Sequence, residues 1–193
     1  MDNPYYKQEL FVAQVDKKDN VIGEVERWKA HKDGALHRGF TAILTYNGQY
    51  LLQHRKHPAF DKYWDFTFSS HQIYENGQLE SDLDAIYKAL FREWNLNKTD
   101  IFEKPKKIGQ VYYLAKDPHS IYTEHEIDYI YLAKIKKLPH PNLDYSYKYE
   151  LIDSVDKIKK LPASPKLQRG EPSSYILAPW VKQIITDTPF DNK

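Results

Sequence analysis

The sequence carries histidines and glutamates at spacings that could place them around one metal ion. His31 and His37 flank a tight segment of five residues, and His71 follows a stretch rich in aromatic residues and threonine. Glu124 and Glu126 are two residues apart, so in a β-strand both side chains leave the same face. Divalent transition metals accept imidazole and carboxylate ligands. These five residues are therefore candidate ligands; the ordinary alternative is hydrogen-bonded core histidines and a solvated strand face.

A further carboxylate, Glu93, falls on the apolar side of a predicted helix. It lies seven residues after Ile86, and the two project within about 20° of each other around an α-helix. An unpaired buried charge is costly, so Glu93 needs a partner. Arg92, a backbone group or a metal ion could serve, and a structural ion pair is the commonest outcome.

Hydrophobic patterns predict the elements that must position these residues. Apolar residues at helical spacing predict a helix over 81–96. Asn47-Gly48 is the favoured two-residue hairpin turn, here between strands at 37–46 and 49–55. Further strands are expected at 10–15, 21–27, 64–70, 107–115, 126–135 and 145–151, and helices at 154–160 and 175–186. This order predicts an α+β fold, with a mixed sheet packed between helices.

Composition narrows the class of protein. The 193 residues suit a single domain over 1–193, and the proline-containing stretch 162–173 is expected to be an ordered loop within it. Lysine plus arginine (28) nearly balances aspartate plus glutamate (27), so we expect neither nucleic acid nor a membrane as partner. The absence of cysteine excludes disulfides and thiol nucleophiles and fits the cytoplasm. No apolar signal or membrane-spanning run is present, and the sequence gives no oligomeric state.

Several motifs together resemble the type I isopentenyl-diphosphate isomerases. They run in the same order as in that family, from about Val15 to Trp180. The matching segments are VDKKDNVIG (15–23), HKDGALHR (31–38), YLLQHR (50–55), TEHEI (123–127) and APW (178–180). The resemblance implies a Nudix-type fold, a small-molecule diphosphate substrate, and interconversion of isopentenyl and dimethylallyl diphosphates.

The resemblance also implies metal sites. A Mn²⁺ or Zn²⁺ ion would be held by all five candidate ligands named above. Glu93 matches the carboxylate that holds Mg²⁺ against the substrate diphosphate, a role suited to an oxygen ligand. Arg27 and Arg55 match basic residues that grip the diphosphate. The family often has two basic residues shortly before this glutamate, and here Lys88 and Ala89 stand there, which makes Lys88 a further candidate.

Three more residues match the family's proton-transfer machinery. Tyr113 and Glu126 match the pair that delivers a proton at one alkene face, and Trp180 matches the aromatic residue that stabilises a tertiary carbocation. The structural alternatives are an ordinary strand tyrosine and a core tryptophan. Ser69 stands where the family has its catalytic cysteine. A thiol titrates near ~8.5 and a serine hydroxyl is a far weaker acid, so a rate loss of about 10²–10⁴ is expected.

Two other functions remain open. A Nudix pyrophosphohydrolase needs several helix glutamates to hold metals and activate water. Glu80 and Glu93 keep positions of that pattern, but Lys88, Ala89 and Arg92 replace its arginine and first two helix glutamates, and Trp64-Asp65 resembles certain hydrolases. A non-catalytic relative that binds metal or prenyl diphosphate is the third possibility. The ordered motifs place the isomerase first.

Overall fold

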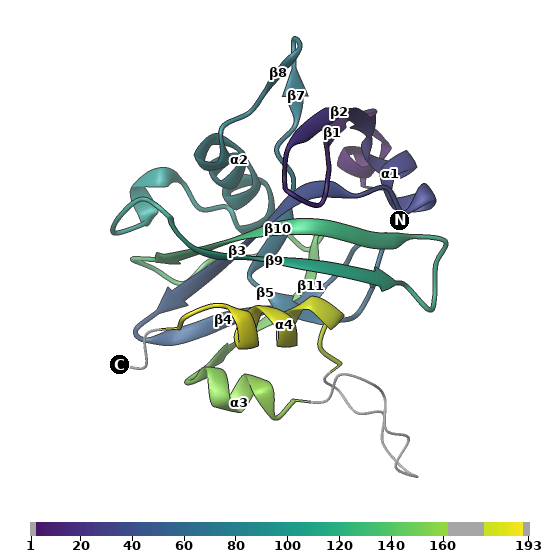
Figure 1. Ribbon diagram of the computed structural model, residues 1–193. Coiled ribbons are helices and arrows are strands. Elements are labelled where there is room, and N and C mark those ends of the chain that lie inside the picture. The colour runs from purple at the N-terminus through teal and green to yellow at the C-terminus, as the bar shows by residue number, and fades with distance from the viewer. Residues whose placement is uncertain (1–2, 162–175, 191–193) are drawn as a thin grey trace.

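The computed structural model describes residues 3–161 and 176–190 (Figure 1). Nine of the strands in these residues form one mixed sheet. Its strands are β1 (Phe11–Val15), β2 (Val21–Glu26), β3 (His37–Tyr46), β4 (Gln49–Arg55), β5 (Trp64–Phe66), β6 (Phe68–Ser70), β9 (Lys106–Lys116), β10 (Thr123–Lys134) and β11 (Ser146–Ile152). A separate hairpin joins β7 (Tyr74–Glu75) to β8 (Gln78–Leu79). The helices are α1 (Arg27–Asp33), α2 (Asp82–Trp94), α3 (Val155–Lys159) and α4 (Pro179–Asp187), with 3-10 turns η1 (Pro4–Lys7) and η2 (Lys98–Asp100).

Strand β3 lies at the centre and is buried on both faces. It runs parallel to β10 and antiparallel to its other partners. Phe40 and Leu44 pack in the core beneath α2, whereas Ile43, which points the other way, packs with α4. Figure 1 shows α2 on one side of the sheet and α3 and α4 on the other. The predicted α+β sheet between helices is therefore confirmed.

The hairpin predicted from Asn47-Gly48 is present. Both residues have positive φ, 48° and 80°, as a type I′ turn requires. β3 and β4 pair only beside this turn and then separate, and β5 and β6 fill the gap on β4 and β3 respectively. The predicted strand 64–70 is thus split at Thr67. Its hydroxyl donates to the carbonyl of Leu51 at 2.8 Å and accepts from the Leu44 amide at 2.9 Å, joining the diverging strands.

A helix that the sequence did not predict, α1, follows β2, and the last helix begins later than predicted. The strand expected over 21–27 ends at Glu26, whose carboxylate caps α1 by accepting from the amides of Trp28 and Lys29. The final helix begins at Pro179 rather than 175, because the chain just before it is extended and bridges to Trp64. Residues 162–175, which include the predicted loop, lie outside the described residues. Within the described part of the chain, no helix has the length and apolar character needed to cross a membrane.

Candidate active site

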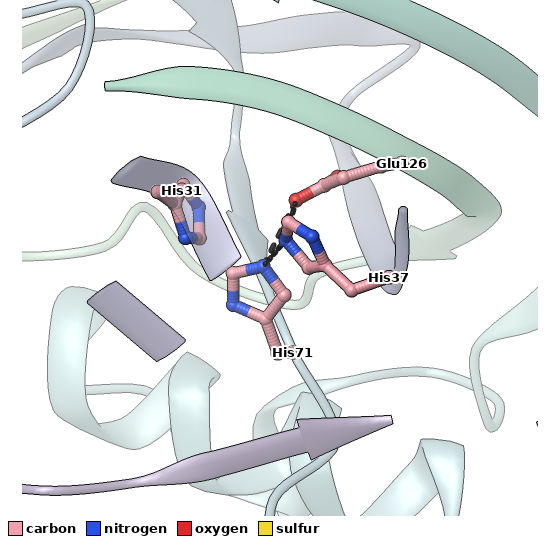
Figure 2. Close-up of side chains that lie close together, drawn as sticks. All are labelled: His31, His37, His71 and Glu126. Atoms are coloured by element: carbon pink, nitrogen blue, oxygen red, sulfur yellow. Dashed lines mark hydrogen bonds and ion pairs between the residues drawn. The ribbon is translucent and has the colours of Figure 1, made fainter. Parts of the chain in front are cut away.

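Four side chains from separate segments converge at one end of β3 and β10. His31 comes from α1, His37 begins β3, His71 follows β6, and Glu126 lies on β10. One potential ligand atom from each lies within 4.8 Å of the others (Figure 2). His31, His37 and Glu126 are almost wholly buried, with 1%, 0% and 4% exposure. The structure therefore brings four of the five predicted ligands into one cluster, hereafter the histidine cluster.

The hydrogen bonds of two histidines fix which ring nitrogen faces the cluster. His31 Nδ1 lies 2.7 Å from the carbonyl oxygen of Arg27, and His37 Nδ1 lies 2.8 Å from that of Ala35. A carbonyl only accepts, so each Nδ1 carries the hydrogen and each Nε2 offers a lone pair in the neutral ring. Metal-binding histidines are oriented in this way.

The lone pairs and a carboxylate then point at one another. His37 Nε2 lies 3.2 Å from His71 Nε2 and 3.3 Å from Glu126 Oε1, and His71 Nε2 lies 2.9 Å from the same oxygen. Burial lowers the pKa of the His71 imidazole to about 4 despite its bond to Glu126, so that ring is neutral at pH 7. A divalent ion stabilises such a convergence of lone pairs, and the donor set fits a transition metal.

Gly39 leaves the space that the Glu126 carboxylate occupies. It lies on β3 opposite Asp128 of β10. A Cβ built on Gly39 would lie 2.8 Å from Glu126 Cδ. Any larger residue at position 39 must displace the carboxylate from the cluster.

Three carboxylates share the inward face of β10. Glu124, Glu126 and Asp128 are 4%, 4% and 0% exposed, so the alternative of a solvated strand face does not hold. Glu124 Oε2 lies 3.1 Å from His31 Nε2, although Glu124 is not one of the four residues of the cluster. Burial lowers the pKa of His31, but Glu124, Glu126 and the hydrogen bond to the Arg27 carbonyl together raise it above its usual value.

The candidate proton-transfer residues line a small cavity beside the histidine cluster. The Tyr113 hydroxyl donates to Glu126 Oε2 at 2.6 Å, and the Tyr113 ring stacks on Trp180 with centroids 5.4 Å apart. Ser69, Tyr113, Glu126 and Trp180 all border this cavity. Trp180 is also a core residue, 1% exposed, and its Nε1 donates to Asp65 at 2.9 Å.

Ser69 belongs to a row of four hydrogen-bonding side chains. Its Oγ lies 3.2 Å from Asp65 Oδ2 and 2.9 Å from Thr41 Oγ1, which in turn lies 2.8 Å from Asp128 Oδ2. Three such contacts need three hydrogens, and the two hydroxyls supply only two. Burial and the charge of Glu126 raise the pKa of Asp128 well above its usual range, which favours the protonated form that would supply the third.

The candidate diphosphate residues border a second cavity. Arg27, Arg55, Arg92 and Glu93 line it, and it shares six residues with the first cavity: His31, Arg55, His57, Ser69, Ser70 and His71. Arg55 is paired with Asp65 at 2.7 Å, and Arg92 with Glu93 at 2.8 Å. Glu93 is 7% exposed, and burial raises its pKa. The cavities adjoin: Arg27 and Arg92 border only the second, Glu126 borders only the first, and Arg55, His31 and His71 border both.

Lys88 is not in either cavity. Its side chain is half-exposed and forms ion pairs with Glu75, at 2.7 Å, and with Glu80. Both carboxylates lie at the β7–β8 hairpin, and neither lines the cavity that the arginines border. The expectation that Lys88 would contact the diphosphate is therefore corrected: a different basic residue of α2, Arg92, reaches that cavity.

Comparison with known proteins decides the family. No protein-family model matches the chain. Isopentenyl-diphosphate Delta-isomerase 1 of Mesocricetus auratus is 31% identical over 191 residues, covering 90% of this chain and 79% of that protein. The chain belongs to the isopentenyl-diphosphate Delta-isomerase family. The enzyme of that name from Pectobacterium atrosepticum is also 31% identical, over 153 residues that cover 75% of this chain and 78% of the bacterial protein.

Solved structures support the fold of this isomerase-family chain. DR0079 of Deinococcus radiodurans superimposes with a TM-score of 0.64 and 14% identity, covering 91% of this chain and 97% of that one. A MutT NUDIX hydrolase from Burkholderia pseudomallei gives a TM-score of 0.54 and 15% identity, covering 79% and 97%. These low identities show the fold alone, and the predicted Nudix-type fold is confirmed.

Sequence reasoning on this isomerase-family chain missed three residues of the site. Asp128 continues the alternation of Glu124 and Glu126 along β10, so the two-residue period was a usable signal. Arg92 was considered only as a partner of Glu93, and Asp65 only as a point of resemblance to hydrolases. The place of Arg92 at the second cavity, and of Asp65 beside Arg55 and Ser69, depends on contacts between elements far apart in the sequence.

Proposed function

We propose that this protein is an isopentenyl-diphosphate Delta-isomerase. It adds a proton to the terminal carbon of the alkene and removes another from the carbon nearer the diphosphate, so that atoms and charge balance. The observation that carries the proposal is the pair of adjoining cavities. One offers three arginines to an anionic group, and the other offers hydroxyls and a carboxylate to a short apolar group.

Two metal sites belong to this proposal. His31, His37, His71 and Glu126, with Glu124 beside them, would hold Mn²⁺ or Zn²⁺. Glu93 would hold Mg²⁺ against the diphosphate, since hard cations prefer oxygen ligands. A bound ion would supply positive charge that keeps nearby carboxylates ionised and makes nearby hydroxyls more acidic.

The chain's own residues would handle the protons. Tyr113, bonded to Glu126, serves one face of the alkene. Ser69 serves the other from the position of the family's cysteine. Trp180 borders the same cavity, and its ring would stabilise positive charge on the tertiary carbon.

Ser69 is the reason to expect a slow enzyme. A hydroxyl is a weak acid, but Thr41 connects Ser69 over two hydrogen bonds to the carboxyl of Asp128, whose pKa is raised by burial. That row gives Ser69 a source of protons, which supports weak activity rather than none.

The test is an isomerisation assay on the purified protein. Isopentenyl diphosphate is incubated with Mg²⁺ and either Mn²⁺ or Zn²⁺, and NMR follows the formation of dimethylallyl diphosphate and of free phosphate in one sample. We expect slow isomer formation that Glu126→Gln abolishes. Release of phosphate without isomer would replace the proposal with the hydrolase.

The structure gives the hydrolase little support. Glu80, one of the two glutamates that keep positions of the hydrolase pattern, is engaged by Lys88 and by the amide of Ile73 at 3.0 Å. A binding-only protein would show metal and diphosphate binding with neither product.

A further inference from the structure

Three arginines with largely buried side chains surround the second cavity, and two of them share one aromatic ring. The Tyr5 ring centroid lies 3.9 Å from Arg92 Cζ and 4.7 Å from Arg27 Cζ. Arg27 Nη2 donates to the Tyr5 carbonyl at 3.0 Å, which holds the ring in place. The charge of Arg92 lowers the pKa of Arg27, as does burial, the larger cause. Two like charges this close repel, so the arrangement calls for an anion between them.

The same arginines have hydrogen-bond donors to spare. The Nε atoms of Arg27, Arg55 and Arg92 are all buried, and none has a hydrogen-bond partner among the described residues. Buried donors without acceptors are costly, and native proteins keep few of them. Three such groups around one cavity indicate a ligand rich in acceptor oxygens.

The charges around the cavity are unbalanced as well. Asp65 balances Arg55, and Glu93 balances Arg92. Arg27 forms no ion pair with a carboxylate in residues 3–161 and 176–190, yet its side chain is almost wholly buried. One positive charge is left over, before any Mg²⁺ is bound at Glu93.

We propose that Arg92 is a diphosphate-binding residue and completes a three-arginine site with Arg27 and Arg55. This inference rests on the proposed function, because it takes the substrate to be a diphosphate monoester. A guanidinium binds phosphate oxygens through two parallel N–H groups. Arg92 Nη2 donates to Glu93 and, at 3.2 Å, to the Ser70 hydroxyl, whereas its Nε has no partner among the described residues and can donate to the ligand.

The experiment measures the binding of inorganic pyrophosphate in the presence of Mg²⁺ by isothermal titration calorimetry. Arg92→Met should weaken binding by about 10- to 100-fold, the loss expected for charge-assisted hydrogen bonds. Arg92→Lys keeps the charge but loses the two parallel N–H groups of the guanidinium, so this variant should recover part of the lost affinity. Lys88→Met is the matched control, because Lys88 lies one turn earlier on α2 but forms its ion pairs with Glu75 and Glu80, outside the cavity. The affinity of this variant should stay within about twofold of that of the natural protein.

A purely structural role for Arg92 predicts a different pattern. Arg92→Met would then lower the melting temperature but leave pyrophosphate affinity unchanged, and that result overturns the proposal. If Arg92→Met does not fold, Arg92→Gln keeps an N–H donor for Glu93 and undergoes the same titration.

Kinetics separate this inference from the proposed function. If the natural protein isomerises isopentenyl diphosphate, Arg92→Met should raise KM by a larger factor than it lowers kcat. If the protein binds pyrophosphate through Arg92 but forms no isomer, the proposed function fails and the arginine site stands. If it isomerises and Arg92→Met binds pyrophosphate normally, the arginine site fails alone. A natural protein that does not bind pyrophosphate overturns the inference.

Discussion

Replacing Gly39 by alanine tests whether the Glu126 carboxylate belongs to a metal site. The new Cβ would lie 2.8 Å from Glu126 Cδ and closer still to Oε2, whereas ordinary contact begins at 3.4 Å, so the carboxylate must retreat by at least about 0.6 Å. Metal–ligand distances tolerate deviations of only about 0.2 Å. The retreat therefore removes Glu126 from the coordination shell. β3 and β10 lie paired at the centre of the sheet, so their backbones cannot separate easily.

The expected result is a metal affinity at least about 10-fold lower in Gly39→Ala, the loss typical of disturbing a residue that supports a metal site. The affinity of Mn²⁺ or Zn²⁺ is measured by competition with a chelating dye. Gly23→Ala is the matched control, because Gly23 also lies in a strand and an added Cβ there meets nothing within 4 Å. Natural metal affinity in a folded Gly39→Ala protein would refute the placement of Glu126 as a ligand.

Four further predictions follow from the site. Ser69→Cys should raise the isomerisation rate by about 10²-fold if proton transfer limits it; an inert, folded, metal-loaded variant would count against the isomerase. Asp128→Asn should lower the rate of the natural protein but affect Ser69→Cys less, because a thiol needs the row of hydroxyls less. Removing the metal with a chelator should lower the free energy of unfolding by about 2.7 kcal/mol if the free metal concentration was 100 times its Kd beforehand. The loss is measured as a fall in melting temperature. Burial and the charge of Arg55 lower the pKa of His57 well below its usual range. The free energy of unfolding should therefore fall as the pH drops below about 6.5, because His57 takes up a proton in the unfolded chain but not in the folded one. Denaturant titrations should show that His57→Gln reduces this pH dependence by up to about 1.4 kcal/mol per pH unit.

Local patterns predicted those elements whose own residues specify them. α2 follows from its apolar spacing and begins after Ser81, whose hydroxyl accepts from the amide of Asp84. The β3–β4 turn follows from Asn47-Gly48. α1 carries no such signal, because seven residues are too few to show a helical period. The break between β5 and β6 could not be predicted either, since Thr67 acts through backbone atoms of β3 and β4.

The candidate ligands could be predicted from residue type and spacing, to which the family motifs add their order, and this is enough for groups fixed on strands and at their ends. Long basic side chains are harder to place. Lys88 and Arg92 lie four residues apart on α2, so their Cα–Cβ bonds point in similar directions. Their destinations differ because Lys88 meets two carboxylates at the β7–β8 hairpin, whereas Arg92 meets Glu93 and the Tyr5 ring.

Apart from Glu93, the groups that Lys88 and Arg92 contact are not their neighbours in the sequence. Matching by position therefore made Lys88 the candidate diphosphate-binding residue of α2, although Arg92, one turn further along, is the residue that reaches the cavity. The same reasoning applies to Ser69. Its residue type suggests a weakened acid, but its partners, Thr41 and Asp65, come from β3 and β5, and only the assembled sheet joins it to the carboxyl of Asp128. The rates of Ser69→Cys with and without Asp128→Asn will therefore show whether residue type or surroundings governs proton transfer at this position.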